Sequence, residues 1–289
     1  MAYTSDYWGR YDSRVSTDAL YQEWATWVTG VLTARGWEKT ADSGQINTAT
    51  VTTPGVTDAE AGYEIRTSPT SAHTTFYIKV WYRTGYNANI PQISLEVGTG
   101  SDGSGTLTGV TSSAIPDLGQ GWAAGNATPY SMNMGIHGDE DSLWFHARDP
   151  ETAVYTGWTG LERTTNTSGV STDEGVLMSG QYYNVTSRWQ CVLWGGAGAL
   201  ETVASTLRLV EAAYGGNTAV ILPVFVYDGV DTMRQYRDLV FAHASGGMRF
   251  DATVKGSSLR YRAGCVTNST NIFGYTMPQD MAVCIREAP

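Results

Sequence analysis

Two histidines and three carboxylates stand within ten residues of one another, and they form the most metal-like group in the chain. The group comprises His137, Asp139, Glu140, Asp141 and His146. Imidazoles and carboxylates of this kind bind divalent transition metals. Their spacing matches none of the established zinc patterns, and Asp139-Glu140-Asp141 stands where a β-hairpin must reverse. We therefore predict no metal site, and keep His137, Asp139, Asp141 and His146 as weak candidates for one.

A glycine-rich segment, Gly98–Gly105, is the second place where chemistry is conceivable. No Lys-Ser or Lys-Thr pair follows its last glycine, so it does not match a phosphate-binding loop. Asp102 is its only acid, whereas a calcium-binding EF-hand loop needs several spaced carboxylates and a terminal glutamate. We predict a long turn between strands that binds no cofactor.

The sequence contains no recognisable motif for nucleophilic catalysis. The nearest approach to a Gly-x-Ser-x-Gly elbow is Ala244-Ser245-Gly246, which lacks the first glycine. His73 and His243 are isolated in the sequence. A carboxylate pair for glycoside hydrolysis is defined by its separation in space, so a glycan-cleaving enzyme stays open as an alternative. We predict that the protein is not an enzyme and has no catalytic residue and no cofactor.

The overall composition indicates which kinds of binding partner the protein is expected to have. The chain has 289 residues, a net charge of −10 and 16% charged residues, against about 25% in an average soluble domain. No basic stripe supports nucleic-acid binding. No apolar segment approaches the roughly 20 residues of a membrane span, and residues 1–20 do not resemble a signal peptide. We expect synthesis in the cytoplasm, with Cys191, Cys265 and Cys284 as buried free thiols.

Aromatic residues are abundant, with 10 Trp and 17 Tyr. Both side chains join a large apolar body to a polar tip, which suits contact surfaces between proteins or with glycans. The alternative is that they fill the core, where Trp is usually found. We predict the following interaction residues: Trp24, Trp27, Trp122, Tyr130, Trp144 and Trp158.

One amphipathic helix is predicted near the start of the chain. Ser16 or Thr17 is a suitable N-cap, Asp18 suits the first turn, and Gly36 suits the position after the last turn. Apolar residues follow helical spacing on one face: Leu20, Trp24, Trp27, Val28, Val31 and Leu32. Such a stripe must cover a sheet or a neighbouring subunit.

After Gly36 the pattern alternates with a period of two, which is typical of strands. Phe76, Ile78, Val80 and Tyr82 share one face of a predicted strand. The predicted strands span residues 62–66, 74–83, 93–97, 131–136, 143–147, 157–162, 175–178, 188–193, 219–227, 239–244, 251–254, 259–266 and 281–285. Residues 137–141 form a turn and 111–130 are irregular, while 202–214 fit either a helix or a loop.

Short strands separated by turn signals predict a mainly β fold, as a β-sandwich or an open barrel. We divide the chain into an N-terminal arm and helix, residues 1–40, and a β-rich body, residues 41–289. The body is either one unit or two packed β lobes, about 41–150 and 151–289.

Several strand and loop motifs resemble those of a β-rich family of virion proteins from tailed bacteriophages. The first is the strand Phe76–Tyr82, followed by Pro91–Val97 and by the Gly98–Gly105 loop. Further similar motifs are Asp141–Phe145, Gly157–Thr164 and Leu259–Arg262. The resemblance covers about two thirds of the chain, judged by the span of these motifs in a β fold of this size. It carries over no catalytic residue.

The resemblance implies a structural component of the virion, made in the host cytoplasm and assembled as symmetric copies in the neck, tail or baseplate. Its partners would be copies of itself and other virion proteins. A low-charge surface rich in Trp and Tyr suits such packing. The alternatives are a module that binds host surface glycans, with Trp122, Tyr130, Trp144 and Trp158 as its contacts, and a head decoration protein.

Overall fold

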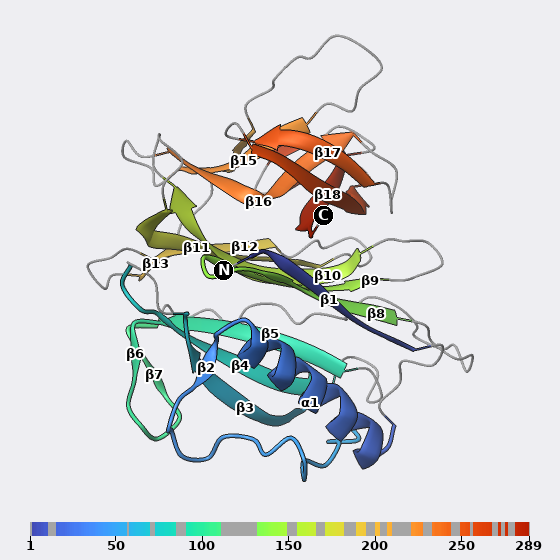
Figure 1. Cartoon of the computed structure of the whole chain (residues 1–289), viewed down its shortest axis with the longest axis vertical. Coiled ribbons are helices and arrows are strands. Elements are labelled where there is room, and N and C mark those ends of the chain that lie inside the picture. Colours follow the sequence, from blue (N-terminus) through green and yellow to red (C-terminus); the bar gives the residue numbers. More distant parts are fainter. Residues whose placement is uncertain are drawn as a thin grey trace.

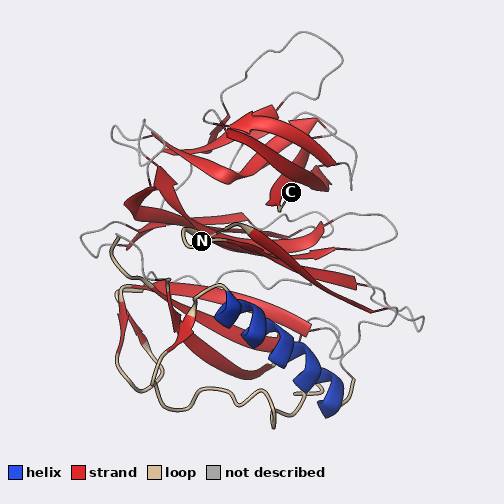
Figure 2. Ribbon diagram, viewed as in Figure 1, coloured by secondary structure: helices blue, strands red, loops and turns tan. Residues whose placement is uncertain are grey.

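A computed structural model gives the fold of the chain. It describes residues 2–10, 16–56, 58–69, 73–84, 91–110, 132–148, 155–165, 171–181, 189–194, 200–202, 207–209, 221–227, 233–243, 249–254, 257–267, 271–272, 275–276 and 281–288. The fold is mainly β, with antiparallel sheets, one helix near the N-terminus and a sandwich-like stacking of layers (Figure 2). The predicted fold class is confirmed.

Three sheets form successive layers (Figure 1). The central sheet has seven strands in the order β1 (Thr4–Arg10), β8 (Met132–Gly138), β9 (Ser142–Arg148), β10 (Tyr155–Thr165), β11 (Ser171–Gln181), β12 (Trp189–Trp194) and β13 (Leu200–Thr202). Above it in the figure, the C-terminal sheet has six strands in the order β14 (Leu207–Leu209), β15 (Ile221–Tyr227), β16 (Met233–His243), β21 (Met281–Glu287), β18 (Ser257–Thr267) and β17 (Arg249–Val254).

Below the central sheet lies the N-terminal sheet, and the helix α1 lies alongside it (Figure 1). Its four strands follow the order β2 (Glu38–Lys39), β3 (Glu60–Thr67), β4 (Tyr77–Thr84) and β5 (Pro91–Gly98). Two short hairpins complete the set, β6 (Gly100–Ser101) with β7 (Leu107–Thr108), and β19 (Asn271–Ile272) with β20 (Tyr275–Thr276).

The helix α1 (Asp18–Ala34) forms as its sequence predicts. The Thr17 side chain caps it by accepting from the Leu20 amide at 3.3 Å, and Gly36 follows the C-cap with φ of +76°. The buried stripe of the helix covers both neighbouring layers. Trp24 packs edge-on against Tyr82 of the N-terminal sheet, and its indole Nε1 lies 3.3 Å from Met134 Sδ of the central sheet.

The predicted strand faces are confirmed in the N-terminal sheet. Phe76, Ile78, Val80 and Tyr82 are buried, as their alternation requires. On the central sheet, Met134, Ile136, Leu143 and Phe145 are fully buried. By the pairing register they share one face, the face that meets α1 through Met134.

Several boundaries differ from the predicted ones. Residues 4–10, predicted only as an arm, form β1 at the edge of the central sheet. The turn predicted over 137–141 is shorter, because β8 continues to Gly138. Part of the open segment 202–214 is strand, Leu207–Leu209. The irregular segment 111–130 lies outside the described residues.

The division near residue 150 falls between β9 and β10, which pair directly with each other in the central sheet. Residues on both sides of this position therefore belong to one sheet. Among the described residues, no helix has the length and apolar character needed to cross a membrane.

Candidate functional site

A group of three buried carboxylates and two half-buried arginines joins the central sheet to the C-terminal sheet. The central sheet contributes Asp139, from the β8–β9 turn, and Glu162 of β10. The C-terminal sheet contributes Arg237 and Asp238 of β16, and Arg286 of β21. We call these five residues the intersheet cluster.

Arg237 binds both sheets. Its Nη2 lies 2.8 Å from Asp139 Oδ2, and its Nε lies 2.8 Å from Asp238 Oδ1. Arg286 Nη1 adds a second cation 3.0 Å from Asp238 Oδ1. From the opposite sheet, Glu162 accepts the backbone N–H groups of Arg237 at 2.6 Å and of Asp238 at 3.0 Å. Each contact crosses the interface or orients a group that does.

Three carboxylates share this interior, and the cluster shifts their pKa values in opposite directions. Burial alone would raise the pKa of Asp238, but Arg237 and Arg286 hold it at about 2. Burial, together with the negative charge of Asp238, raises the pKa of Asp139 and of Glu162. The cluster therefore lowers the pKa of Asp238 and raises the pKa values of Asp139 and Glu162.

This difference predicts how stability depends on pH. Because the pKa of Glu162 is raised in the folded state, its contribution to stability is present below the unfolded value of 4.5 and is lost as the pH rises through the folded value. We expect Glu162→Gln, which cannot titrate, to flatten this decline. Urea unfolding from pH 5 to pH 8 would measure it. Since the substitution also perturbs two hydrogen bonds, the slope is the readout, and an unchanged slope would contradict the assignment.

The candidate metal ligands do not gather at one point. His137 and His146 stack with 4.8 Å between ring centroids, and His137 Nε2 lies 2.9 Å from His146 Nδ1. Asp139 instead faces Arg237, and Asp141 lies 3.6 Å from Arg163 Nε. The described residues contain no group of three or more potential ligands. The four candidates are thus divided among a histidine pair and two ion pairs.

Two of the predicted interaction residues are interior, which corrects their expected place on a surface. Trp24 and Trp144 are fully buried within the chain. Trp27 is half-buried and packs against Trp8 of β1, with ring centroids 6.5 Å apart. Trp122 and Tyr130 lie outside the described residues, as does the side chain of Trp158. Of the cysteines, Cys284 is a buried thiol whose pKa burial raises.

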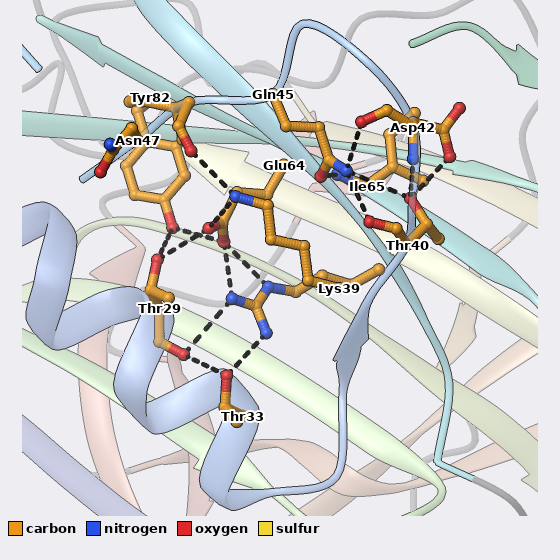
Figure 3. A network of polar contacts seen from close by, with 12 residues as sticks. Thr29, Thr33, Lys39, Thr40, Asp42, Gln45, Asn47, Glu64, Ile65 and Tyr82 are labelled. Carbon is orange, nitrogen blue, oxygen red and sulfur yellow. Dashed lines mark hydrogen bonds and ion pairs between the residues drawn. The ribbon is translucent and has the colours of Figure 1, made fainter. Parts of the chain in front are cut away.

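A second ionic group holds α1 to the N-terminal sheet (Figure 3). Arg66 and Glu64, two residues apart on β3, are both fully buried and lie 2.7 Å apart from Nη2 to Oε2. Glu64 also accepts from Thr29 of the helix at 3.0 Å and from Tyr82 at 2.9 Å. Arg66 donates to the carbonyl oxygen of Trp37 at 2.6 Å. This pair is therefore enclosed by hydrogen-bonding partners.

The glycine-rich loop, Gly98–Gly105, packs on the opposite face of the N-terminal sheet, where it has a structural role. Lys79 Nζ lies 4.0 Å from the Tyr63 ring centroid and 4.1 Å from that of Trp81, and it donates to the Gly105 carbonyl at 2.7 Å. Asp42 accepts from the Gly105 amide at 3.2 Å and from Ser101 Oγ at 2.8 Å. The loop closes over a lysine that the aromatic rings already enclose.

Gly105 is required by this closure. Its φ is +97°, and a Cβ there would meet the Tyr63 hydroxyl at 1.8 Å. We expect Gly105→Ala to cost about 3 kcal/mol of folding free energy, from backbone strain and displacement of Tyr63. The matched control is Gly103→Ala, where φ is +77° but no atom lies within 4 Å; it should cost about 1 kcal/mol. Equal losses in chemical denaturation would refute the contact.

Sequence reasoning missed the members of the intersheet cluster other than Asp139. Glu162, Arg237, Asp238 and Arg286 are charged residues inside strand-like sequence, and a charge at such a position is the sequence signal for them. Glu162 and Asp238 are buried, and the two arginines are half-buried. A charge that interrupts an apolar strand needs a partner in the fold. The partner itself comes from another sheet and cannot be identified from spacing along the chain.

Comparison of the chain with protein-family models, with curated proteins and with solved structures gives no match.

Proposed function

We propose that this protein is a structural component of a tailed-bacteriophage virion, without catalytic activity, that assembles as symmetric copies in the neck, tail or baseplate region. The observation that carries the non-enzymatic part is the intersheet cluster. Its carboxylates, the best candidates for acid–base chemistry, are engaged by guanidinium and backbone N–H groups of the same chain. Carboxylates that are bound in this way join the central sheet to the C-terminal sheet, and this structural role accounts for their burial.

The assignment to a virion rests on the strand and loop motifs that resemble the phage family. Two of them form neighbouring strands of one sheet, because Tyr77–Thr84 pairs with Pro91–Gly98. The glycine-rich loop that follows them covers Lys79, which donates to the Gly105 carbonyl. The resemblance thus rests on elements with clear roles in the fold, as expected for a structural family.

Mass spectrometry of purified particles tests the proposal. We expect the chain in gradient-purified virions at a copy number comparable with that of other neck, tail or baseplate proteins. An abundant host cytoplasmic protein serves as the control, since it should disappear during purification. Loss of the chain together with that host protein would overturn the proposal.

A further inference from the structure

Two fully buried histidines stack against each other in the central sheet, one strand in from its edge. His137 of β8 and His146 of β9 have rings 17° from parallel, with centroids 4.8 Å apart. His137 Nε2 lies 2.9 Å from His146 Nδ1, which is a hydrogen-bonding distance. Whichever ring donates, one of these two nitrogens must be without a proton.

This hydrogen bond limits the charge that the folded histidine pair carries. Two imidazoles have four ring nitrogens, so a pair that keeps the bond holds at most three protons and one positive charge. A second positive charge would break the bond, and burial would make that charge costly. An imidazole in water has a pKa of about 6.5, so both histidines are charged in the unfolded chain well below that pH. Unfolding in acid therefore takes up a proton that the folded pair does not hold.

The histidine pair lies where the edge of the central sheet meets the end of the C-terminal sheet. His137 Nδ1 lies 2.8 Å from Ser5 Oγ of β1, and the same oxygen accepts from the Ala288 amide, just beyond β21, at 2.8 Å. Tyr7 of β1 packs edge-on against both imidazoles, with centroid distances of 5.4 and 6.1 Å, and its hydroxyl donates to Glu287 of β21. Both of these links between β1 and the end of β21 therefore run through side chains that contact the histidine pair.

The carboxylates between these two sheets are engaged by groups other than the imidazoles. Glu287 binds Arg249 of β17 at 2.9 Å, and it also binds Arg262 of β18. Farther along, between the same two sheets, lies the intersheet cluster: Asp139, Glu162, Arg237, Asp238 and Arg286. Its carboxylates are bound by its arginines or by backbone N–H groups of β16. A second proton on the histidine pair therefore adds a positive charge where the carboxylates already have partners.

We propose that the histidine pair is an acid-sensitive joint between the central sheet and the C-terminal sheet. At neutral pH the pair supports the links from Ser5 and Tyr7 to the end of β21. Below about pH 6, protonation of both rings separates them and releases these links. The pairing of β1 with β8 and its contacts with α1 are not part of the joint, so β1 stays in the central sheet.

His146→Asn tests the joint, because the asparagine amide keeps a partner for His137 near the position of Nδ1 but does not titrate. Between pH 7.5 and pH 5, the unfolding equilibrium constant should rise about 30-fold more in the wild type than in this variant, as one proton with a pKa of about 6.5 requires. Urea unfolding of the full-length chain measures both, and the comparison cancels the opposite contribution of Glu162. The control is His73→Asn, at a partly exposed ring 3.7 Å from Asp173, which should keep the wild-type dependence on pH. Equal dependence in the wild type and His146→Asn would overturn the proposal.

Two measurements on the wild-type protein need no variant, so they remain decisive if His146→Asn does not fold. Hydrogen exchange, corrected for the intrinsic effect of pH, follows local opening. On acidification to pH 5, protection of the Ala288 amide should fall while amides of β3 and β4 keep theirs. An NMR titration of the histidine rings should show one proton bound by the pair before the Ala288 amide loses protection. Two protons bound while that amide stays protected would overturn the proposal, and so would an equal loss of protection in all strands.

Discussion

Replacing Arg66 with methionine is expected to cost about 3–5 kcal/mol of folding free energy, because it removes the buried guanidinium that pairs with a buried carboxylate. The cation that stays near Glu64 is Lys39, whose Nζ lies 3.2 Å from Oε1 and whose side chain is 36% exposed. Glu64 is fully buried, and the guanidinium of Arg66 approaches it at 2.7 Å. The Trp37 carbonyl would also lose its donor at 2.6 Å. Methionine keeps much of the side-chain length, so the loss reports the charge and its hydrogen bonds. Equilibrium denaturation by urea measures it.

Arg260→Met is the matched control for this prediction. Arg260 forms an ion pair with Asp251 at 3.0 Å, but both side chains are exposed, at 44% and 57%. Exposed pairs of this kind contribute little, because water screens the charges. We expect no measurable change in the unfolding midpoint. A loss as large as that of Arg66→Met would show that burial does not decide the strength of these pairs.

Local patterns in the sequence predicted the elements that depend on neighbouring residues. The helix follows from the Thr17 cap, the apolar spacing from Leu20 to Leu32, and Gly36. The strand of Phe76, Ile78, Val80 and Tyr82 follows from simple alternation, because one of its faces is buried. In both cases a single covered face fixes the pattern, and that pattern is visible without knowledge of the partner.

The elements that were missed depend on partners from distant parts of the chain. β1 has the sequence Thr-Ser-Asp-Tyr-Trp-Gly-Arg, with no apolar alternation, because polar groups of α1 and the end of β21 contact its two faces. The sequence predicts an ordinary acidic turn at Asp139. Arg237, 98 residues away in the sequence, gives it an ion pair instead. The spacing of residues along the sequence predicts neither the contacts of β1 nor the ion pair of Asp139 with Arg237.

The same reasoning explains why aromatic abundance was a weak guide to contact surfaces. Trp24 and Trp144 have the amphipathic character of interface residues, but the layered fold provides two interiors large enough to bury indoles. Trp27 is half-buried and packs against Trp8 of the same chain, so its contact with another molecule stays a prediction. Side-chain type indicates that a ring needs a partner, and the layers decide whether that partner lies within the chain.

Arg237→Met tests the intersheet cluster in the same way, and we expect it to cost about 2–4 kcal/mol. The expected cost is below that of Arg66→Met, since the Arg237 side chain is 24% exposed and Asp238 keeps Arg286 at 3.0 Å. Asp139 has only the more distant Arg286, at 3.9 Å, as its remaining cation among the described residues. The C-terminal sheet should therefore open first, and hydrogen exchange at β16 should rise before exchange at β3 and β4.

A double-mutant cycle with Asp139→Asn separates the ion pair from other effects of the substitution. If the contact of Arg237 with Asp139 at 2.8 Å joins the two sheets, the cost of Arg237→Met should be smaller in the Asp139→Asn background. Removing the second partner relieves the burial of an uncompensated carboxylate, whose pKa burial has already raised. Strictly additive costs would mean that the two residues stabilise the sheets independently, and that the ion pair does not hold the layers together.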